Sequence, residues 1–167
     1  MMNEHYYLHQ TPPELAKELI KSVPIGDGDF LLEPFRGERA FYDNFPENNP
    51  KDWCEITEGF DYKDYNGNYD WVITNPPFQL EEGTKRINAF WLLLDYYSTR
   101  AKKGIAFLAN ERCFSTLTPR RLSILKERGW YIHKIVVCSV KKWRGRYFFI
   151  VFTKQENPFY DYLLKSY

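Results

Sequence analysis

The chain has 167 residues, 44% of them apolar, with 13 Phe, 13 Tyr and 5 Trp, which suits one packed domain and excludes a disordered chain. The mean hydropathy is −0.56, and the longest strongly apolar run, 89–94, is too short to cross a membrane. The single cysteines at 54, 113 and 138 and the three scattered histidines predict neither a disulfide framework nor a metal site.

The net charge of +1 hides an uneven distribution along the chain. Residues 1–99 carry 8 Lys/Arg and 18 Asp/Glu, whereas residues 100–146 carry 13 Lys/Arg and 2 Asp/Glu. Such a basic segment, with Trp130, Tyr131 and Trp143 interleaved, favours a nucleic-acid partner. The alternative is a solvated basic face that pairs with the acidic half of the same fold. The first residues lack the regions of a signal peptide, which predicts an intracellular protein, cytoplasmic or, in a eukaryotic host, nuclear.

The predicted elements alternate between helices and strands. Thr11 is expected to cap a first helix, with Pro12 at its first position and Glu14 completing a capping box. Further helices are expected at 87–98 and 118–129, and short buried strands at 30–33, 53–56, 71–74 and 105–108. The β-rich runs 131–138 and 146–153 close the chain, joined by a loop with Lys141, Lys142 and Arg144. This order predicts an α/β fold whose mostly parallel sheet is covered on both faces, with an antiparallel edge. We expect one domain, 1–167.

Polar and turn-forming residues follow three of these strands, at the edge where ligands bind in open α/β sheets. Glu33 and the loop to Phe41 follow the first, Glu55 follows the second, and Asn75-Pro76-Pro77-Phe78 follows the strand at 71–74. No Gly-x-Gly-x-x-Gly and no phosphate loop is present, so nucleotide binding of those kinds is not expected.

On these residues the chain, from Tyr7 to about Thr153, resembles the S-adenosylmethionine-dependent amino-methyltransferases, in particular the adenine-specific group that modifies DNA. The resemblance implies a Rossmann-like class I fold with a seven-stranded sheet. It also implies an enzyme that methylates the exocyclic 6-amino nitrogen of adenine, with S-adenosylmethionine as cofactor. It assigns catalysis to Asn75, Pro76, Pro77 and Phe78, and cofactor binding to Tyr7, Thr11, Pro12, Glu33, Pro34, Phe35, Gly37, Glu55, Ile56 and Asp61.

The tetrapeptide also suits this chemistry by itself. An aromatic exocyclic amine is a poor nucleophile because its lone pair is conjugated into the ring. Two acceptors aimed at its hydrogens, the Asn75 side-chain oxygen and the Pro76 carbonyl, would stabilise the charge that develops on nitrogen. The consecutive prolines hold the backbone extended. Phe78 offers a ring on which the target base could stack, for roughly 1–3 kcal/mol.

Several alternatives remain open. The same tetrapeptide occurs in enzymes that methylate the 4-amino group of cytosine, RNA adenine, or a glutamine amide of a protein, and the basic segment disfavours the last of these. DNA is favoured over RNA. With no separate target-recognition domain, sequence specificity is expected to be short, weak or supplied by a partner subunit, through the loops 79–86, 111–118 and 139–146. A non-catalytic relative that binds nucleic acid or regulates is the alternative of a different class.

Arg39 is the one departure from the family pattern, which has glycine there. Glycine tolerates a positive φ and lets the backbone approach the cofactor closely. If the loop keeps the family's path, Arg39 has a positive φ, which costs roughly 1–2 kcal/mol and weakens cofactor binding about tenfold. The alternative, which we favour, is a negative φ at Arg39, with its guanidinium pointing outward or paired with Glu38 or a neighbouring acid.

Overall fold

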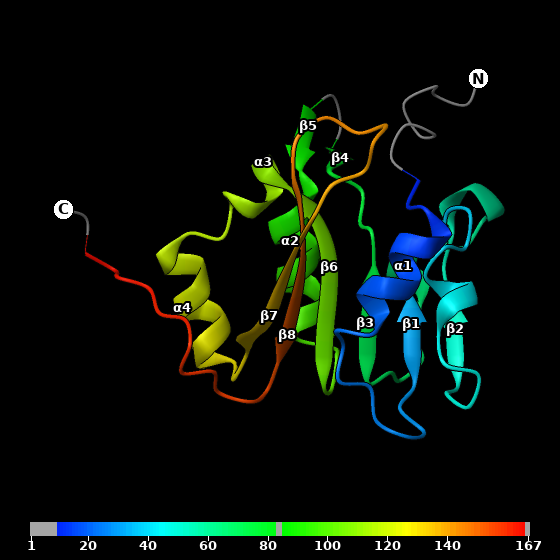
Figure 1. The fold of residues 1–167 in the computed structure, drawn as a ribbon, viewed down its shortest axis with the longest axis horizontal. Helices are drawn as coiled ribbons and strands as arrows, with labels where there is room; N and C mark the ends of the chain where they lie inside the picture. Colours follow the sequence, from blue (N-terminus) through cyan, green and yellow to red (C-terminus); the bar gives the residue numbers. More distant parts are fainter. Residues whose placement is uncertain (1–9, 83–84, 166–167) are drawn as a thin grey trace.

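A six-stranded sheet forms the centre of the protein in a computed structural model, which describes residues 10–82 and 85–165 (Figure 1). The strand order is β2-β1-β3-β6-β8-β7. β1, β2, β3 and β6 are parallel to one another, and β8 is antiparallel to both β6 and β7. The strands are β1 (Leu31–Glu33), β2 (Lys51–Trp53), β3 (Trp71–Thr74), β6 (Gly104–Asn110), β7 (Tyr131–Cys138) and β8 (Tyr147–Thr153).

Five of the six strand runs expected from the sequence are strands of this sheet, so the Rossmann-like α/β fold is confirmed. The run expected at 53–56 is displaced, because β2 ends at Trp53 and Ile56 begins the 3-10 turn η3. The expected count of seven is wrong for the described residues, because none of them forms a strand on the outer edge of β2. Two 3-10 turns, η3 (Ile56–Glu58) and η4 (Tyr62–Asp64), occupy the chain between β2 and β3. The antiparallel strand β8 lies one position in from the edge, which β7 forms.

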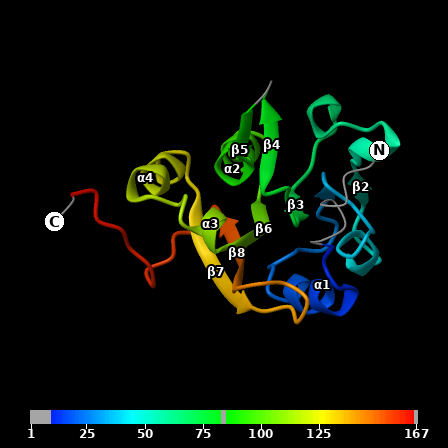
Figure 2. The same ribbon diagram turned by 90° about the horizontal axis from the view of Figure 1, so that it is seen from above.

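Helices cover both faces of the sheet (Figure 2). α1 (Pro13–Ile20) packs on one face, beside the 3-10 turn η2 (Tyr42–Asn44), and α2 (Ala89–Ser98) and α4 (Pro119–Glu127) pack on the other. α4 begins as expected, since the Thr118 side chain accepts a hydrogen bond from the Arg121 N–H. The cap expected at Thr11 is wrong. Pro12 is the N-cap residue of α1, without a side-chain cap bond, and Thr11 is buried.

A hairpin that the sequence did not predict follows the tetrapeptide. β4 (Gln79–Glu82) and β5 (Lys85–Asn88) pair with each other in a separate two-stranded sheet. The segment 79–86 was expected to be a loop, and the helix was expected to include Ile87. The helix α2 begins instead at Ala89, because the Asn88 side chain accepts a hydrogen bond from the Phe90 N–H and caps it. A four-residue helix, α3 (Glu111–Phe114), lies in the other expected loop.

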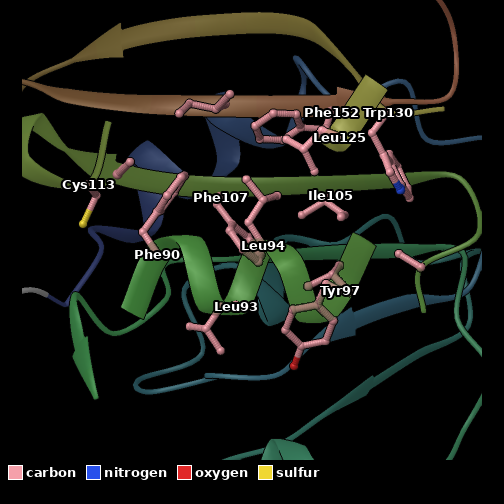
Figure 3. Packing of buried hydrophobic residues seen from close by; sticks show 14 of the residues in the cluster. Phe90, Leu93, Leu94, Tyr97, Ile105, Phe107, Cys113, Leu125, Trp130 and Phe152 are labelled. Atoms are coloured by element: carbon pink, nitrogen blue, oxygen red, sulfur yellow. The ribbon is translucent and has the colours of Figure 1, made fainter. Parts of the chain in front are cut away.

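Two apolar clusters hold the layers together, one on each face of the sheet. Alternate residues of the central strands point to opposite faces, so that Ile105 and Phe107 pack against α2 while Ala106 and Leu108 pack toward α1. Figure 3 shows the first cluster, in which Phe90, Leu94 and Tyr97 of α2 lie against β6. Because the central strands are buried on both faces, they read as continuous apolar runs in the sequence.

Candidate functional site

The three polar strand ends meet at the carboxyl edge of the sheet. β1 lies between β2 and β3 and is parallel to both, so the loops that follow these strands are neighbours. The chain leaves β1 toward β2 and then returns to β3 on the other side of β1. This reversal is the topological switch point, where open α/β sheets bind their ligands. The Thr74 hydroxyl at the end of β3 donates to the Phe35 carbonyl over 3.5 Å and joins two of the loops.

Glu33, at the end of β1, is buried, with 2% of its surface exposed. One carboxylate oxygen accepts a hydrogen bond of 2.7 Å from the Tyr42 N–H. Burial raises the pKa of Glu33 well above its ordinary value, although the Tyr42 N–H and the nearby Arg36 act in the opposite direction. The Glu33 carboxylate therefore fixes the first residue of the turn η2, which follows the loop after β1.

Glu55 fixes the same loop from the end of β2. One oxygen of its buried carboxylate accepts a hydrogen bond of 2.8 Å from the Gly37 N–H. The other accepts from the N–H of Thr57 at 3.1 Å and from its hydroxyl at 2.8 Å. Both oxygens of the Glu55 carboxylate therefore help to fix backbone N–H groups at this edge of the sheet.

The backbone at position 37 favours glycine, and a larger residue there would also displace the end of a neighbouring side chain. Its φ is +50°, and a Cβ there would lie 2.6 Å from Oε1 of Gln10. The same oxygen of Gln10 accepts from the Glu38 N–H at 3.2 Å. Gln10 thus places the chain segment before α1 directly over the loop. The family resemblance assigned the adjoining Thr11 and Pro12 to this position but left Gln10 out.

A cavity of about 350 Å³ lies at the end of β2, beside Glu55. Asp61 is in its wall, as an acceptor whose Oδ1 already holds the Lys63 N–H at 2.9 Å. Two apolar side chains in this region are exposed: Ile56 has 67% of its surface accessible to solvent and Phe60 has 57%. The full lining is Asp52, Trp53, Cys54, Gly59, Phe60, Asp61, Asp64 and Tyr65. Such an aromatic and acidic cavity suits a flat, nitrogen-rich ring.

Arg36 is a site residue that the sequence did not reveal. Only 8% of it is exposed, and its guanidinium carbon lies 3.6 Å from the ring centroid of Trp53, which lines the cavity. Its Nη2 forms an ion pair with Glu58 of η3. Trp53 also contacts Phe60 edge-on, at 5.2 Å between ring centroids. Arg36 therefore supports the cavity wall from within the loop, a role that depends on contacts between distant parts of the chain.

Arg39 has a positive φ of 71°, so the negative φ expected from the sequence is wrong. The second part of that expectation is confirmed, because the guanidinium points outward and pairs with an acid. Its Nη2 lies 2.9 Å from Oδ1 of Asp43, with about half of each side chain exposed. The backbone keeps the left-handed conformation that glycine would adopt, while the side chain leaves the loop.

The tetrapeptide 75–78 directly follows β3. Pro76 is buried and the other three residues are half-buried. The Phe78 carbonyl accepts a hydrogen bond of 3.1 Å from the Ala89 N–H, which ties the tetrapeptide to the first turn of α2. The Phe78 ring lies 6.3 Å from that of Tyr147. The end of the tetrapeptide is therefore fixed on two sides.

Tyr147 connects the tetrapeptide to the basic loop, which we define as residues 139–146. Its ring packs at 4.6 Å against that of Trp143, which belongs to the loop and is buried. β8 begins at Tyr147, opposite the last residue of β6, so the loop also lies at the carboxyl edge. Lys141, Lys142 and Arg144 are exposed on it.

The structure thus brings together most of the residues that the sequence singled out. The described residues from the three strand ends lie at one edge, including Pro34, which is buried, and Phe35, whose ring packs at 5.0 Å on that of Tyr62. Tyr7 lies outside the described residues. Among residues 10–82 and 85–165, no group of three or more His, Cys, Asp or Glu could hold a metal ion. In the same ranges no helix is long and apolar enough to span a membrane.

The sequence matches no family model and no curated protein. Solved structures do resemble the chain. TrmN from Thermus thermophilus is 17% identical, with a TM-score of 0.58 over 90% of this chain and 51% of TrmN. A modification subunit assigned to a type I restriction enzyme of Vibrio vulnificus YJ016 is 14% identical, with a TM-score of 0.61 over 87% of this chain and 44% of the subunit.

The third comparison is the magnesium protoporphyrin IX methyltransferase ChlM from Synechocystis PCC 6803, solved with bound SAM. It is 10% identical, with a TM-score of 0.58 over 85% of this chain and 77% of ChlM. The chain spans about half the length of TrmN and of the Vibrio subunit. At these identities the likeness concerns the fold alone, and the chain has the Rossmann-like fold of the class I methyltransferases.

Proposed function

We propose that the protein transfers a methyl group from S-adenosylmethionine to the exocyclic 6-amino nitrogen of adenine in DNA. The observation that carries the proposal is the position of Asn75-Pro76-Pro77-Phe78. It lies at the carboxyl end of β3 and at the switch point, next to the loop after β1. The methyltransferase fold of the chain supports the same reaction class.

The residues around the switch point fit the cofactor. The cavity combines the aromatic side chains of Trp53 and Phe60 with the carboxylate of Asp61 in its lining, a combination that suits an adenine ring. Glu55 would hold the ribose hydroxyls, and the loop from Glu33 to Gly37 would contact the methionine end. When bound, S-adenosylmethionine supplies an electrophilic methyl group on a positively charged sulfur.

The chain's own contribution to the reaction is to orient and polarise the amine. The Asn75 side-chain oxygen and the Pro76 carbonyl would accept hydrogen bonds from the two amino hydrogens of the target base. These bonds draw the nitrogen lone pair out of conjugation and stabilise the positive charge that develops on nitrogen. Phe78 would stack on the base, and its attachment to α2 and Tyr147 fixes the plane of stacking. A base within a duplex must first be flipped out of the helix.

The basic loop supports a nucleic acid as the substrate, because Lys141, Lys142 and Arg144 are exposed at the same edge as the tetrapeptide. A sequence-specific partner subunit remains part of the proposal, since the loops at this edge are short. RNA adenine and the 4-amino group of cytosine are tested as alternative acceptors below.

Asn75→Ala should test the proposal directly. We expect methyl transfer to fall by about a hundredfold or more, since the lost hydrogen bond contributes on the order of 3 kcal/mol to the transition state. Cofactor affinity should change little, because the Asn75 side chain acts on the substrate amine. The measurement is transfer of labelled methyl groups onto duplex DNA, single-stranded DNA and RNA, with cofactor binding followed by calorimetry.

Near-full activity of the variant would remove the role of Asn75 as amine activator. Transfer to RNA or to cytosine alone would replace the proposed substrate. Absence of cofactor binding by the unaltered protein would instead favour a non-catalytic, nucleic-acid-binding relative. Arg39 in a glycine position was the sequence feature that favoured this reading, but its backbone keeps the conformation of glycine.

A further inference from the structure

The exposed cations of the basic loop are part of a larger surface. β6 ends at Asn110 directly opposite Tyr147, the first residue of β8, so the chain after β6 and the chain before β8 emerge side by side. The segments 111–121 and 139–146 contain seven Lys/Arg and one acidic residue, Glu111. The basic residues are Arg112, Arg120, Arg121, Lys141, Lys142, Arg144 and Arg146.

Most of these charges are exposed to solvent. Glu111, the one acidic residue of the two segments, forms an ion pair with Arg146 of the same surface, with 3.2 Å between Oε1 and Nε. Arg112 on α3 and Arg120 in the first turn of α4 are exposed, and the structure gives neither an ion pair with any residue in the described ranges. Arg121 is half-buried, with its guanidinium 4.9 Å from the ring of Trp91 and donating to the Thr116 carbonyl. Its position is therefore fixed.

Four other cations of the basic segment lie away from this edge. Lys102 and Lys103 precede β6 at the amino edge of the sheet, and Lys103 is paired with Asp29. Lys126 and Arg128 lie at the far end of α4, where Arg128 is paired with Asp95 at 2.8 Å. The structure thus separates the basic segment into a carboxyl edge with exposed cations and an opposite end where two of the cations are paired.

The elements that carry the exposed cations follow one another across the molecule. Figure 1 shows the loop between β7 and β8, α3 and the start of α4 toward the edge at which β6 ends. Seen from above, α3 lies between the loop and α4, and α4 is the more distant from β3 (Figure 2). The exposed cations therefore form a line that starts at the basic loop beside the site and passes over α3 to the start of α4. This line leads away from the site on one side only.

We propose that a DNA strand follows this line, with its phosphates bound first by the basic loop and then by Arg112 and Arg120. This inference rests on the proposed function and adds a direction to it. The protein contacts the backbone mainly on one side of the target base, over several nucleotides. Arginine suits this role because its planar guanidinium binds phosphate oxygens with two donors.

Binding measurements test the line without any methyl transfer. We would measure the fluorescence anisotropy of a labelled 24-nucleotide single strand of DNA across a series of salt concentrations, with the Arg112→Gln/Arg120→Gln protein. Lys102→Gln/Lys126→Gln is the matched control, since it removes two cations from the same segment of the chain. We expect a loss of affinity of about tenfold at moderate salt and a log–log salt slope that is smaller by about 0.7 per lost phosphate contact. The control should change neither. Equal effects of the two double variants would overturn the proposal.

A second experiment tests the direction. Methyl transfer is measured on strands with one target adenine that are shortened stepwise from the 5′ or the 3′ side. The unaltered protein should lose activity steeply on shortening from one side, and Arg112→Gln/Arg120→Gln should remove that difference. Symmetrical loss in the unaltered protein would overturn the direction. The two proposals fail separately, because Asn75→Ala should retain the full binding and salt slope of the unaltered protein. If the protein binds DNA along the line but transfers no methyl group, only the proposed function is contradicted.

Discussion

Arg39 occupies a position where the family pattern has glycine, and its backbone nevertheless adopts the left-handed conformation that glycine would take. A residue with a Cβ pays roughly 1–2 kcal/mol for the left-handed conformation that glycine adopts freely. In return its guanidinium reaches Asp43 and lies 5.6 Å from the ring centroid of Tyr42. Exposed pairs of this kind stabilise a protein by less than about 1 kcal/mol. The residue is therefore expected to be a net cost to stability, with little direct effect on the cofactor.

Arg39→Gly should raise the free energy of unfolding by about 0.5–1 kcal/mol, because relief of the positive φ outweighs the lost ion pair. The affinity for S-adenosylmethionine should change by less than about threefold, since the side chain already points away from the loop. Urea unfolding and calorimetry measure the two quantities. Arg39→Ala is the control, because it removes the ion pair and keeps the strain, and it should not stabilise the protein. A large gain in cofactor affinity on restoring glycine would show that the native loop is impaired.

At the scale of elements, a cluster of tyrosines joins the segment between β2 and β3 to the helix α2. Tyr62 and Tyr69 come from the segment between β2 and β3, and their rings lie 6.3 and 6.2 Å from that of Tyr97 on α2. Tyr96 contacts Tyr97 edge-on at 4.9 Å. Ring contacts thus hold the segment between β2 and β3 against α2. Tyr97 is the most deeply buried of them, and burial raises the pKa of its hydroxyl well above the ordinary value.

Tyr97→Phe should stabilise the protein. The Tyr97 hydroxyl is buried without a hydrogen-bond partner among the described residues, and a buried polar group without a partner costs about 1–3 kcal/mol. Removing the oxygen keeps the ring contacts, so we expect the free energy of unfolding to rise by about 1 kcal/mol. Urea denaturation with an unchanged m-value is the measurement. Tyr96→Phe, in the same cluster but half-buried, should have little effect. Destabilisation by Tyr97→Phe would mean that the hydroxyl is bonded in solution.

At the scale of the whole molecule, the two edges of the sheet differ in how their charges are used. At the amino edge, the buried Asp29 accepts hydrogen bonds from the Gly26 N–H at 2.8 Å and from Nε1 of Trp71 at 2.9 Å. It also pairs with Lys103. One carboxylate thus joins the segment before β1, the first residue of β3 and the residue that precedes β6. The carboxyl edge instead holds the exposed cations and the candidate site.

Asp29 should make stability depend on pH in the acid range. Burial by itself would raise its pKa, but the hydrogen bonds from Lys103, Gly26 and Trp71 outweigh burial and lower the pKa below the ordinary 3.8. A carboxyl whose pKa is lower in the folded state stabilises the protein above its unfolded pKa, and this contribution is lost as the pH falls. Asp29→Asn should cost about 1–3 kcal/mol near pH 7, and the difference from the unaltered protein should shrink below pH 4. Thermal unfolding between pH 3 and 8 measures it, with the exposed Asp27→Asn as control. A difference that is independent of pH would contradict the prediction.

The sequence by itself determined the order of the elements and the strand ends that carry the site. The strands β1, β3, β6 and β8 appear as apolar runs in the sequence because they are buried on both faces of the sheet. The prolines after β3 end that strand for a local reason, because they lack the backbone N–H that a strand needs. The position of the tetrapeptide at the end of a strand could therefore be predicted from the sequence alone. The rule that parallel strands end at one edge then predicted that Glu33, Glu55 and Asn75 would be neighbours.

Only the tertiary structure decided the features that depend on distant contacts. The tyrosine cluster gathers rings from η4, from Tyr69 before β3 and from α2, and no local pattern distinguishes such rings from ordinary core residues. Arg36 resembles an exposed loop arginine in the sequence, and its burial on Trp53 depends on the pairing of β1 with β2. Thr11 was expected to cap α1, but it is buried in the folded protein, and Pro12 is the N-cap residue instead. The division of the basic segment between two edges likewise follows from the path of β6 and α4 through the fold, since sequence position fixes the charge of a segment but not the side of the molecule on which it lies.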